Sequence, residues 1–126
     1  MKKLMCIFVI LFSVGIAYAG EQLGSDELKS LLTGKTVTGE HFKHGLTKTY
    51  YSADGRVKSK SESGVERVGK WWIEEESNKR CIKWDHKNKK FCHYIEQNED
   101  GSHTLIHGNK GKRLVEFKSI KEGMQF

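Results

Sequence analysis

Histidine side chains are the residues of this sequence that could most readily bind a metal ion. The chain contains six of them, and neutral imidazole is a common ligand of zinc and copper. His103 and His107 are an even number of residues apart in a segment with strand-like alternation, so they share one face, and His93 can join them from the neighbouring strand. No HExxH or other established ligand spacing is present. We therefore assign no metal site and keep these three histidines as candidates.

The direction in which these histidines point depends on strand register. A shift of one residue at the turn 98–101 would replace Leu105 by Ile106 in the core and would turn His103 and His107 outward. Leucine and isoleucine are equally suited to a core. The sequence therefore leaves both registers open.

Two cysteines, Cys81 and Cys92, are predicted to form a disulfide. The third, Cys6, lies in an N-terminal leader that we expect to be removed, and an even pair in an oxidising compartment is typical of a disulfide. Closing the ten intervening residues would stabilise the domain by on the order of 3 kcal/mol. A zinc site would need further ligands at regular spacing, which this pair lacks.

Residues that could support catalysis do not occur in a recognisable pattern. There is no Gly-x-Ser-x-Gly or comparable nucleophile motif, and the serines at 52, 59, 61 and 63 are typical of turns and strand surfaces. The acidic run 74–76 enters a turn, where a solvated charge cluster is the common arrangement. We expect no enzyme activity and no cofactor.

The N-terminal leader comprises residues 1–19. Lys2 and Lys3 precede an uncharged apolar run from 4 to 17, and Ala-Tyr-Ala at 17–19 has small residues at the positions that a signal peptidase reads. The apolar run has about 14 residues, whereas a helix needs roughly 20 to cross a bilayer. We predict a signal peptide cleaved after Ala19, which places the mature protein, residues 20–126, in the periplasm or outside the cell.

The mature chain is long enough for a single domain, and its pattern predicts one short helix followed by an all-β fold. Ser25 is typical of an N-cap, leucines at 28, 31 and 32 share one helical face, and Gly34 ends the helix 25–33. From Lys35 onward apolar residues alternate and turn signals recur about every ten to twelve residues. Short connections make neighbouring strands antiparallel, so we predict an up-and-down meander of about eight strands that closes into a small barrel. The expected strands are 35–41, 47–52, 56–61, 66–74, 79–84, 89–96, 102–107 and 112–119.

The predicted disulfide fixes which side chains face the core. If Cys81 faces Cys92, Ile82 lies opposite Phe91, and a four-residue loop at 75–78 places Trp71 opposite Ile82. Trp72 and Tyr94 then lie together on the other face, beside the disulfide. They form either a second packing cluster or a platform for a protein or sugar. The inward residues are expected to be Gly69, Trp71, Ile73, Ile82, Trp84, Phe91, His93 and Ile95.

The charge of the chain excludes some partners. Of the 22 Lys and Arg, two leave with the leader, so 20 basic residues face 16 acidic ones and the mature net charge is +4. The basic residues are interspersed with acids rather than gathered into the patch of a nucleic-acid binder. Charged residues throughout the strands also argue against a lipid-facing barrel. We expect a monomer without nucleic acid and without stable membrane insertion after cleavage.

Several motifs together resemble a family of small exported bacterial proteins classed as a domain of unknown function. They are Leu-Leu-Thr-Gly-Lys-Thr at 31–36, Tyr-Tyr-Ser-Ala-Asp-Gly at 50–55, Gly-Lys-Trp at 69–71, Cys-Ile-Lys-Trp at 81–84, and Cys92. The resemblance implies a secreted or periplasmic helix-plus-β domain and supplies no functional residues. Gly69-Lys70-Trp71 also resembles the Gly-x-Trp signature of lipocalins, but it falls on the fourth strand rather than the first. We expect little room for a ligand in so small a barrel.

Two functions fit these features. The first is an exported, non-catalytic interaction module for a protein or glycan, such as a cell-envelope glycan or a hydrolase that it inhibits. The usual Ser-Gly-x-x-Tyr loop of such inhibitors is absent. The second is a periplasmic protein that binds a metal or a small ligand through a histidine face or a shallow barrel mouth.

Overall fold

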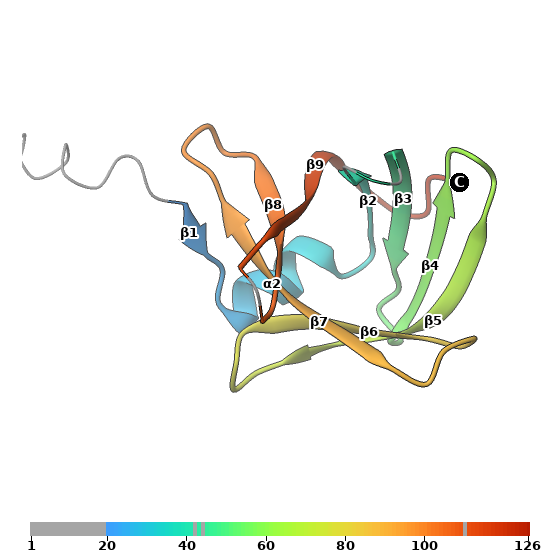
Figure 1. The fold of residues 1–126 in the computed structure, drawn as a ribbon, viewed down its shortest axis with the longest axis horizontal. Helices are drawn as coiled ribbons and strands as arrows, with labels where there is room; N and C mark the ends of the chain where they lie inside the picture. The colour runs from blue at the N-terminus through green and yellow to red at the C-terminus, as the bar shows by residue number, and fades with distance from the viewer. Residues whose placement is uncertain (1–19, 42, 44, 110) are drawn as a thin grey trace, which may run out of the picture.

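A computed structural model describes residues 20–41, 43, 45–109 and 111–126, and it places nine strands and one helix (Figure 1). The predicted signal peptide, including Cys6, lies outside the described residues. The helix and all eight predicted strands are present with bounds close to those expected, and β1 was not predicted. The elements are β1 (Glu21–Gln22), α2 (Ser25–Leu32), β2 (Lys35–His41), β3 (Gly45–Tyr51), β4 (Arg56–Ser61), β5 (Glu66–Glu74), β6 (Lys79–Trp84), β7 (Lys90–Gln97), β8 (His103–His107) and β9 (Arg113–Glu122).

Strands β2 to β9 form a closed antiparallel barrel of eight strands. Each strand pairs with the next in the chain, and β9 pairs with both β8 and β2, which closes the sheet. The two-residue strand β1 lies outside the barrel proper and pairs with the end of β7, beyond the point where β6 begins. The predicted all-β meander is therefore confirmed, and its closure removes the free edges that an open sheet would expose.

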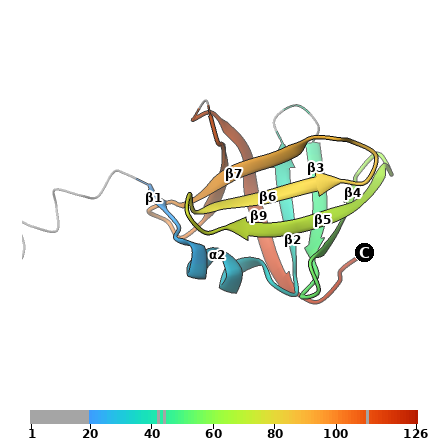
Figure 2. The same cartoon turned by 90° about the horizontal axis from the view of Figure 1, so that it is seen from below.

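Helix α2 packs at one end of the barrel, against β2 and β5 (Figure 2). Leu28 and Leu32 are fully buried there, which accounts for the apolar face of the helix. The N-cap is Gly24 rather than the predicted Ser25. The hydroxyl of Ser25 instead donates to Asn78 Oδ1 at 2.7 Å, while the carboxylate of Glu27 accepts the N–H of Gly24 at 2.9 Å.

Cys81 and Cys92 form the predicted disulfide between β6 and β7. Directly opposite pairs are Cys81 with Cys92, Ile82 with Phe91, and Trp71 with Ile82. The inward and outward faces of β5, β6 and β7 therefore follow the predicted alternation. Trp71, Ile82 and Ile95 belong to the buried core.

In the observed register of β8, Leu105 and not Ile106 faces the barrel core. Leu105 pairs with Ile95, and His107 pairs with His93. Ile106 points the opposite way, across from Tyr94, but it is also buried, at 5% exposure against 7% for Leu105. Because both residues are buried, hydrophobicity alone could not distinguish the two registers.

The meander places alternate hairpins at opposite ends of the barrel. The last residues of β2, β4, β6 and β8 and the first residues of β3, β5, β7 and β9 lie at one end, which we call the open end. The other end carries α2 and the remaining connections, and we call it the closed end. No helix in the described part of the chain is long and apolar enough to cross a membrane.

Candidate functional site in the barrel interior

The barrel contains a cavity of about 670 Å³ that reaches the open end. The expectation that a barrel of this size has little room for a ligand is therefore wrong. Eight strands can enclose one small ligand when the inward side chains do not fill the interior. Several inward side chains near the open end are small, because β2, β3 and β4 contribute Gly39, Thr49, Ser59 and Ser61.

One wall of the cavity is formed by hydroxyl groups on β3 and β4. Ser59, which we predicted to lie in a turn or on a strand surface, is only 5% exposed and faces the interior. Its direct neighbour across the β3–β4 pair is Thr49. This wall can donate or accept hydrogen bonds to polar substituents of a ligand. It comprises Thr47, Thr49, Tyr51, Ser59 and Ser61.

The opposite wall is mainly apolar, with Arg80 and His93 as its polar members. It is built by β6, β7, β8 and β9, and Trp84 and Phe91 lie at its open end. Pockets for organic molecules commonly combine such apolar surface with a few polar groups that fix orientation. The wall comprises Ile82, Trp84, Phe91, Leu105, Val115 and Phe117.

Arg80 brings a positive charge into this cavity. It is 5% exposed, although it carries a guanidinium group, and it lines the cavity from β6. Its Nε is buried without a hydrogen-bond partner. No ion pair joins it to a carboxylate among the residues that the structure describes. Charged groups are rarely buried unless they are paired, so Arg80 is a candidate for contact with a ligand.

The sequence interpretation missed Arg80, although the pattern contained a signal for it. Residues two apart on a strand share a face, and Ile82 and Trp84 were both assigned inward. Residue 80 is two positions before Ile82 on the same strand, so the register predicts that Arg80 also points inward. Arg80 was overlooked because arginine is normally a surface residue.

His93 lies directly opposite Arg80 across the β6–β7 pair. Its Nδ1 is buried and has no hydrogen-bond partner. Burial, followed by the positive charge of Arg80 and by His107, lowers the pKa of His93 from 6.5 to about 4, and a hydrogen bond with the backbone of Cys92 opposes this shift only in part. The imidazole is therefore neutral at neutral pH, and one of its nitrogens can donate a hydrogen bond while the other accepts one.

The three histidine candidates for a metal site are not brought to one point. The rings of His93 and His107 lie 5.3 Å apart between centroids. His103 is four residues from His107 along β8, which corresponds to about 13 Å, and its ring lies 6.2 Å from that of Phe117. The structure thus pairs two of the candidates and separates the third.

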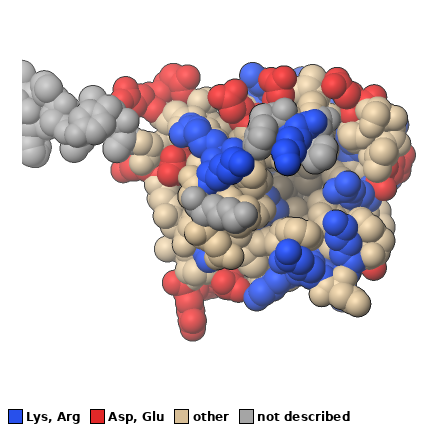
Figure 3. Space-filling model, in the orientation of Figure 1, with Lys and Arg blue, Asp and Glu red and all other residues tan. Residues whose placement is uncertain are grey.

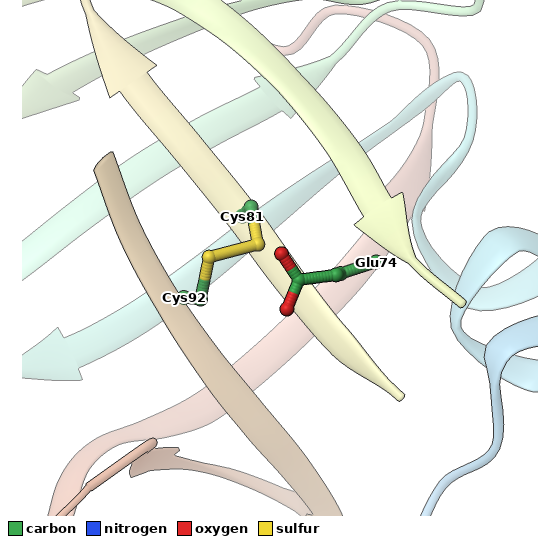
Figure 4. Close-up of side chains that lie close together, drawn as sticks. All are labelled: Glu74, Cys81 and Cys92. Atoms are coloured by element: carbon green, nitrogen blue, oxygen red, sulfur yellow. A yellow bond between two sulfur atoms is a disulfide. The ribbon is translucent and has the colours of Figure 1, made fainter. Parts of the chain in front are cut away.

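Within the described ranges, one group of three possible metal ligands lies close together, namely Glu74, Cys81 and Cys92 (Figure 4). Both sulfur atoms belong to the disulfide and offer no thiolate. The carboxylate of Glu74 accepts hydrogen bonds from Ser77 at 2.7 Å and from Lys90 at 3.3 Å. These two contacts lower the pKa of Glu74. These three residues lie close together because the disulfide is next to the ion pair of Glu74 and Lys90, and this arrangement does not indicate a metal site.

Trp72 and Tyr94, the candidates for contact with a partner, lie on the outside of the barrel. Trp72 pairs with Cys81, and Tyr94 is two residues from Cys92 on the same face. Trp72 is 36% exposed, while the ammonium of Lys79 lies 5.1 Å from the centre of the Tyr94 ring. The predicted arrangement around the disulfide is therefore present, on the face opposite the cavity.

Basic side chains surround the opening of the cavity. Figure 3 shows a hollow with Lys and Arg on its rim. Arg67 and Lys87 line the cavity itself, and the ammonium groups of Lys87 and Lys89 lie 5.6 and 5.4 Å from the centre of the Phe91 ring. A rim of one sign of charge attracts ligands of the opposite sign.

These features define a class, an eight-stranded antiparallel barrel with a hollow, partly polar interior. No model of a protein family, no curated protein and no solved structure matches the chain.

Proposed function

We propose that this protein is an exported, non-catalytic binding protein that holds a small organic molecule inside its barrel. The observation that carries the proposal is the cavity of about 670 Å³, whose volume lies within the range of roughly 300–1,000 Å³ typical of sites for small ligands. Its two walls differ in polarity, so a bound molecule would be held in one orientation.

Export is supported by the disulfide, which is consistent with an oxidising compartment, and by the leader motif in residues 1–19. The periplasm and the cell exterior both satisfy these conditions. The interior site develops one of the two functions expected from the sequence, binding of a small ligand. It differs from that expectation in its location, because the ligand would lie inside the barrel rather than on a histidine face or at a shallow barrel mouth.

A tryptophan scan of β3 tests the proposal. Thr49 faces the cavity, and Lys48 beside it is exposed on the outer face. Thr49→Trp should place an indole ring in the cavity and weaken binding of a neutral apolar fluorescent probe, N-phenyl-1-naphthylamine. Lys48→Trp introduces the same side chain outside the barrel and should leave binding unchanged. Ser59→Phe is a second cavity-filling variant, in case Thr49→Trp does not fold.

The readouts are probe fluorescence, the stoichiometry of binding and the melting temperature. The wild-type protein should bind one probe molecule and melt at a higher temperature when the probe is present, because a ligand of the folded state stabilises it. Absence of saturable binding, or equal binding by Thr49→Trp and Lys48→Trp, would contradict a ligand site in the barrel.

A further inference from the structure

We propose that the molecule held in the barrel is an amphipathic organic acid, whose anionic group pairs with Arg80 and His93 and whose apolar part lies against Trp84 and Phe91. This inference rests on the proposed function, since it specifies the ligand of the same cavity. It concerns the charge of the ligand, which can be tested separately from the question whether the cavity binds a ligand at all.

The charge of Arg80 is buried in the wall of the cavity. Removing a cation from water is costly unless an anion or several hydrogen bonds compensate. Among the described residues no carboxylate pairs with Arg80, and its Nε has no hydrogen-bond partner although it is buried. A carboxylate, sulfonate or phosphate group in the cavity would supply the missing acceptor, because the guanidinium fork matches the geometry of such groups.

His93 lies beside Arg80 in the same wall of the cavity. Directly opposite residues in an antiparallel pair have Cβ atoms about 4.5–5.5 Å apart, so Arg80 and His93 reach the same region of the cavity from adjacent strands. The buried Nδ1 of His93 also has no partner. Nε of Arg80 and Nδ1 of His93 can therefore bind one oxyanion, provided that the single N–H of the neutral imidazole is on Nδ1.

The remainder of the ligand would contact the aromatic side chains that line the cavity. An inorganic ion would satisfy Arg80 but would leave the surfaces of Trp84, Phe91 and Phe117 in contact with water. An organic tail would cover these rings. The serine and threonine wall opposite can pair with hydroxyl or carbonyl groups of the ligand. The charge of the rim, which includes Arg67 and Lys87, would attract an acid to the opening.

The test compares decanoate with decan-1-ol, two ligands of the same length that differ in charge, by calorimetric titration of the mature protein. The wild type should bind decanoate about tenfold to a hundredfold more tightly, which is the range expected for a charge-assisted hydrogen bond. Arg80→Met, which keeps a long apolar side chain and removes the charge, should lose this preference and retain its affinity for decan-1-ol. Lys48→Met removes an exposed cation from the outside and should keep the preference.

A second readout separates a ligand-binding role for Arg80 from a structural one. Without ligand, Arg80→Met should melt at a higher temperature than the wild type, because an unpaired buried charge is replaced by an apolar side chain. A structural role predicts a lower melting temperature. Arg80→Gln gives a further comparison if Arg80→Met does not fold.

The possible results are distinguishable. If both ligands bind equally well to the wild type, the organic-acid assignment fails and the proposed function survives. If neither ligand binds and N-phenyl-1-naphthylamine does not bind either, the proposed function fails as well. If sulfate alone binds as tightly as decanoate, the site takes a simple inorganic anion, and the inference of an organic acid is overturned.

Discussion

The closed end of the barrel is packed with apolar side chains, whereas the cavity that reaches the open end is lined by hydroxyl groups and by Arg80. At the closed end, Leu28 and Leu32 of α2 are fully buried in the cluster that includes Trp71 and Ile95. Around the cavity, inward positions carry residues such as Thr49 and Ser59. Both ends follow the same alternation of inward and outward residues, so side-chain size and polarity determine which end is filled.

Buried polar atoms differ between the two ends in the same way. The indole N–H of Trp71 in the core donates to the carbonyl of Ser52 at 2.8 Å. In the cavity, Arg80 Nε and His93 Nδ1 have no such partner. A buried polar group without a partner costs about 1–3 kcal/mol. The packed core therefore maintains the fold, whereas the cavity holds two polar atoms without a hydrogen-bond partner among the described residues.

The largest expected effect is that of truncating an apolar side chain at the closed end. Leu28→Ala should lower the free energy of unfolding by about 2–5 kcal/mol, since it leaves a void among tightly packed side chains. Phe91→Ala at the open end should cost less, because the Phe91 ring borders an existing cavity. Urea unfolding of both variants measures the difference. A cost for Phe91→Ala equal to that for Leu28→Ala would contradict the division of the barrel into a packed end and a hollow end.

The next effect in size is the loss of the disulfide, which lies on the outer face between the two ends. Replacing Cys81 and Cys92 together by alanine should lower the free energy of unfolding by roughly 3 kcal/mol, because the unfolded chain gains freedom. The folded fraction should still bind N-phenyl-1-naphthylamine with unchanged affinity, since the sulfur atoms face away from the cavity. A weaker affinity of the folded protein would show that the disulfide also shapes the interior.

Much of the fold could be predicted from the sequence because turns and alternation are local signals. The spans of β2 and β4 to β6 agree with the predicted strands at both ends, and the disulfide identified the inward residues of β6 and β7. Strand β1 was missed because two residues, Glu21 and Gln22, give no periodicity. The N-cap was misassigned because Ser25 bonds to a distant residue, Asn78, and such a contact is not a local signal.

The candidate site was harder to predict, because a cavity is a property of the whole barrel. Each inward serine or threonine on β3 and β4 is unremarkable alone, and these residues form a wall only when the strands are curved around the same axis. The inward direction of Arg80 could have been predicted from the alternation of residues along β6. Its lack of a partner could not be predicted, since it depends on which side chains surround Arg80 in three dimensions.

The smallest expected effect is the contribution of His93 to the pH dependence of the free energy of unfolding. Its pKa is about 4 in the folded protein and 6.5 ordinarily. The unfolded state therefore binds a proton more readily below pH 6.5, and this histidine lowers stability as the pH falls from about 6.5 towards 4. Above pH 6.5 it is neutral in both states and has no effect. The charged and titratable groups that lower its pKa are Arg80 and Lys79 of β6 and His107 of β8, while a hydrogen bond with the backbone of Cys92 raises it.

His93→Gln isolates this contribution. Between pH 6.5 and 5 the free energy of unfolding, measured in urea, should fall less steeply for the variant than for the wild type. Burial also lowers the pKa of His103, which destabilises in the same direction and is retained in the variant, so the slope should be reduced and not abolished. The carboxylates with lowered pKa values, such as Asp54 and Asp100, act mainly below this range. An unchanged slope would show that protonation of His93 costs the folded state little, and that the open end is better solvated than its unpaired nitrogen atoms indicate.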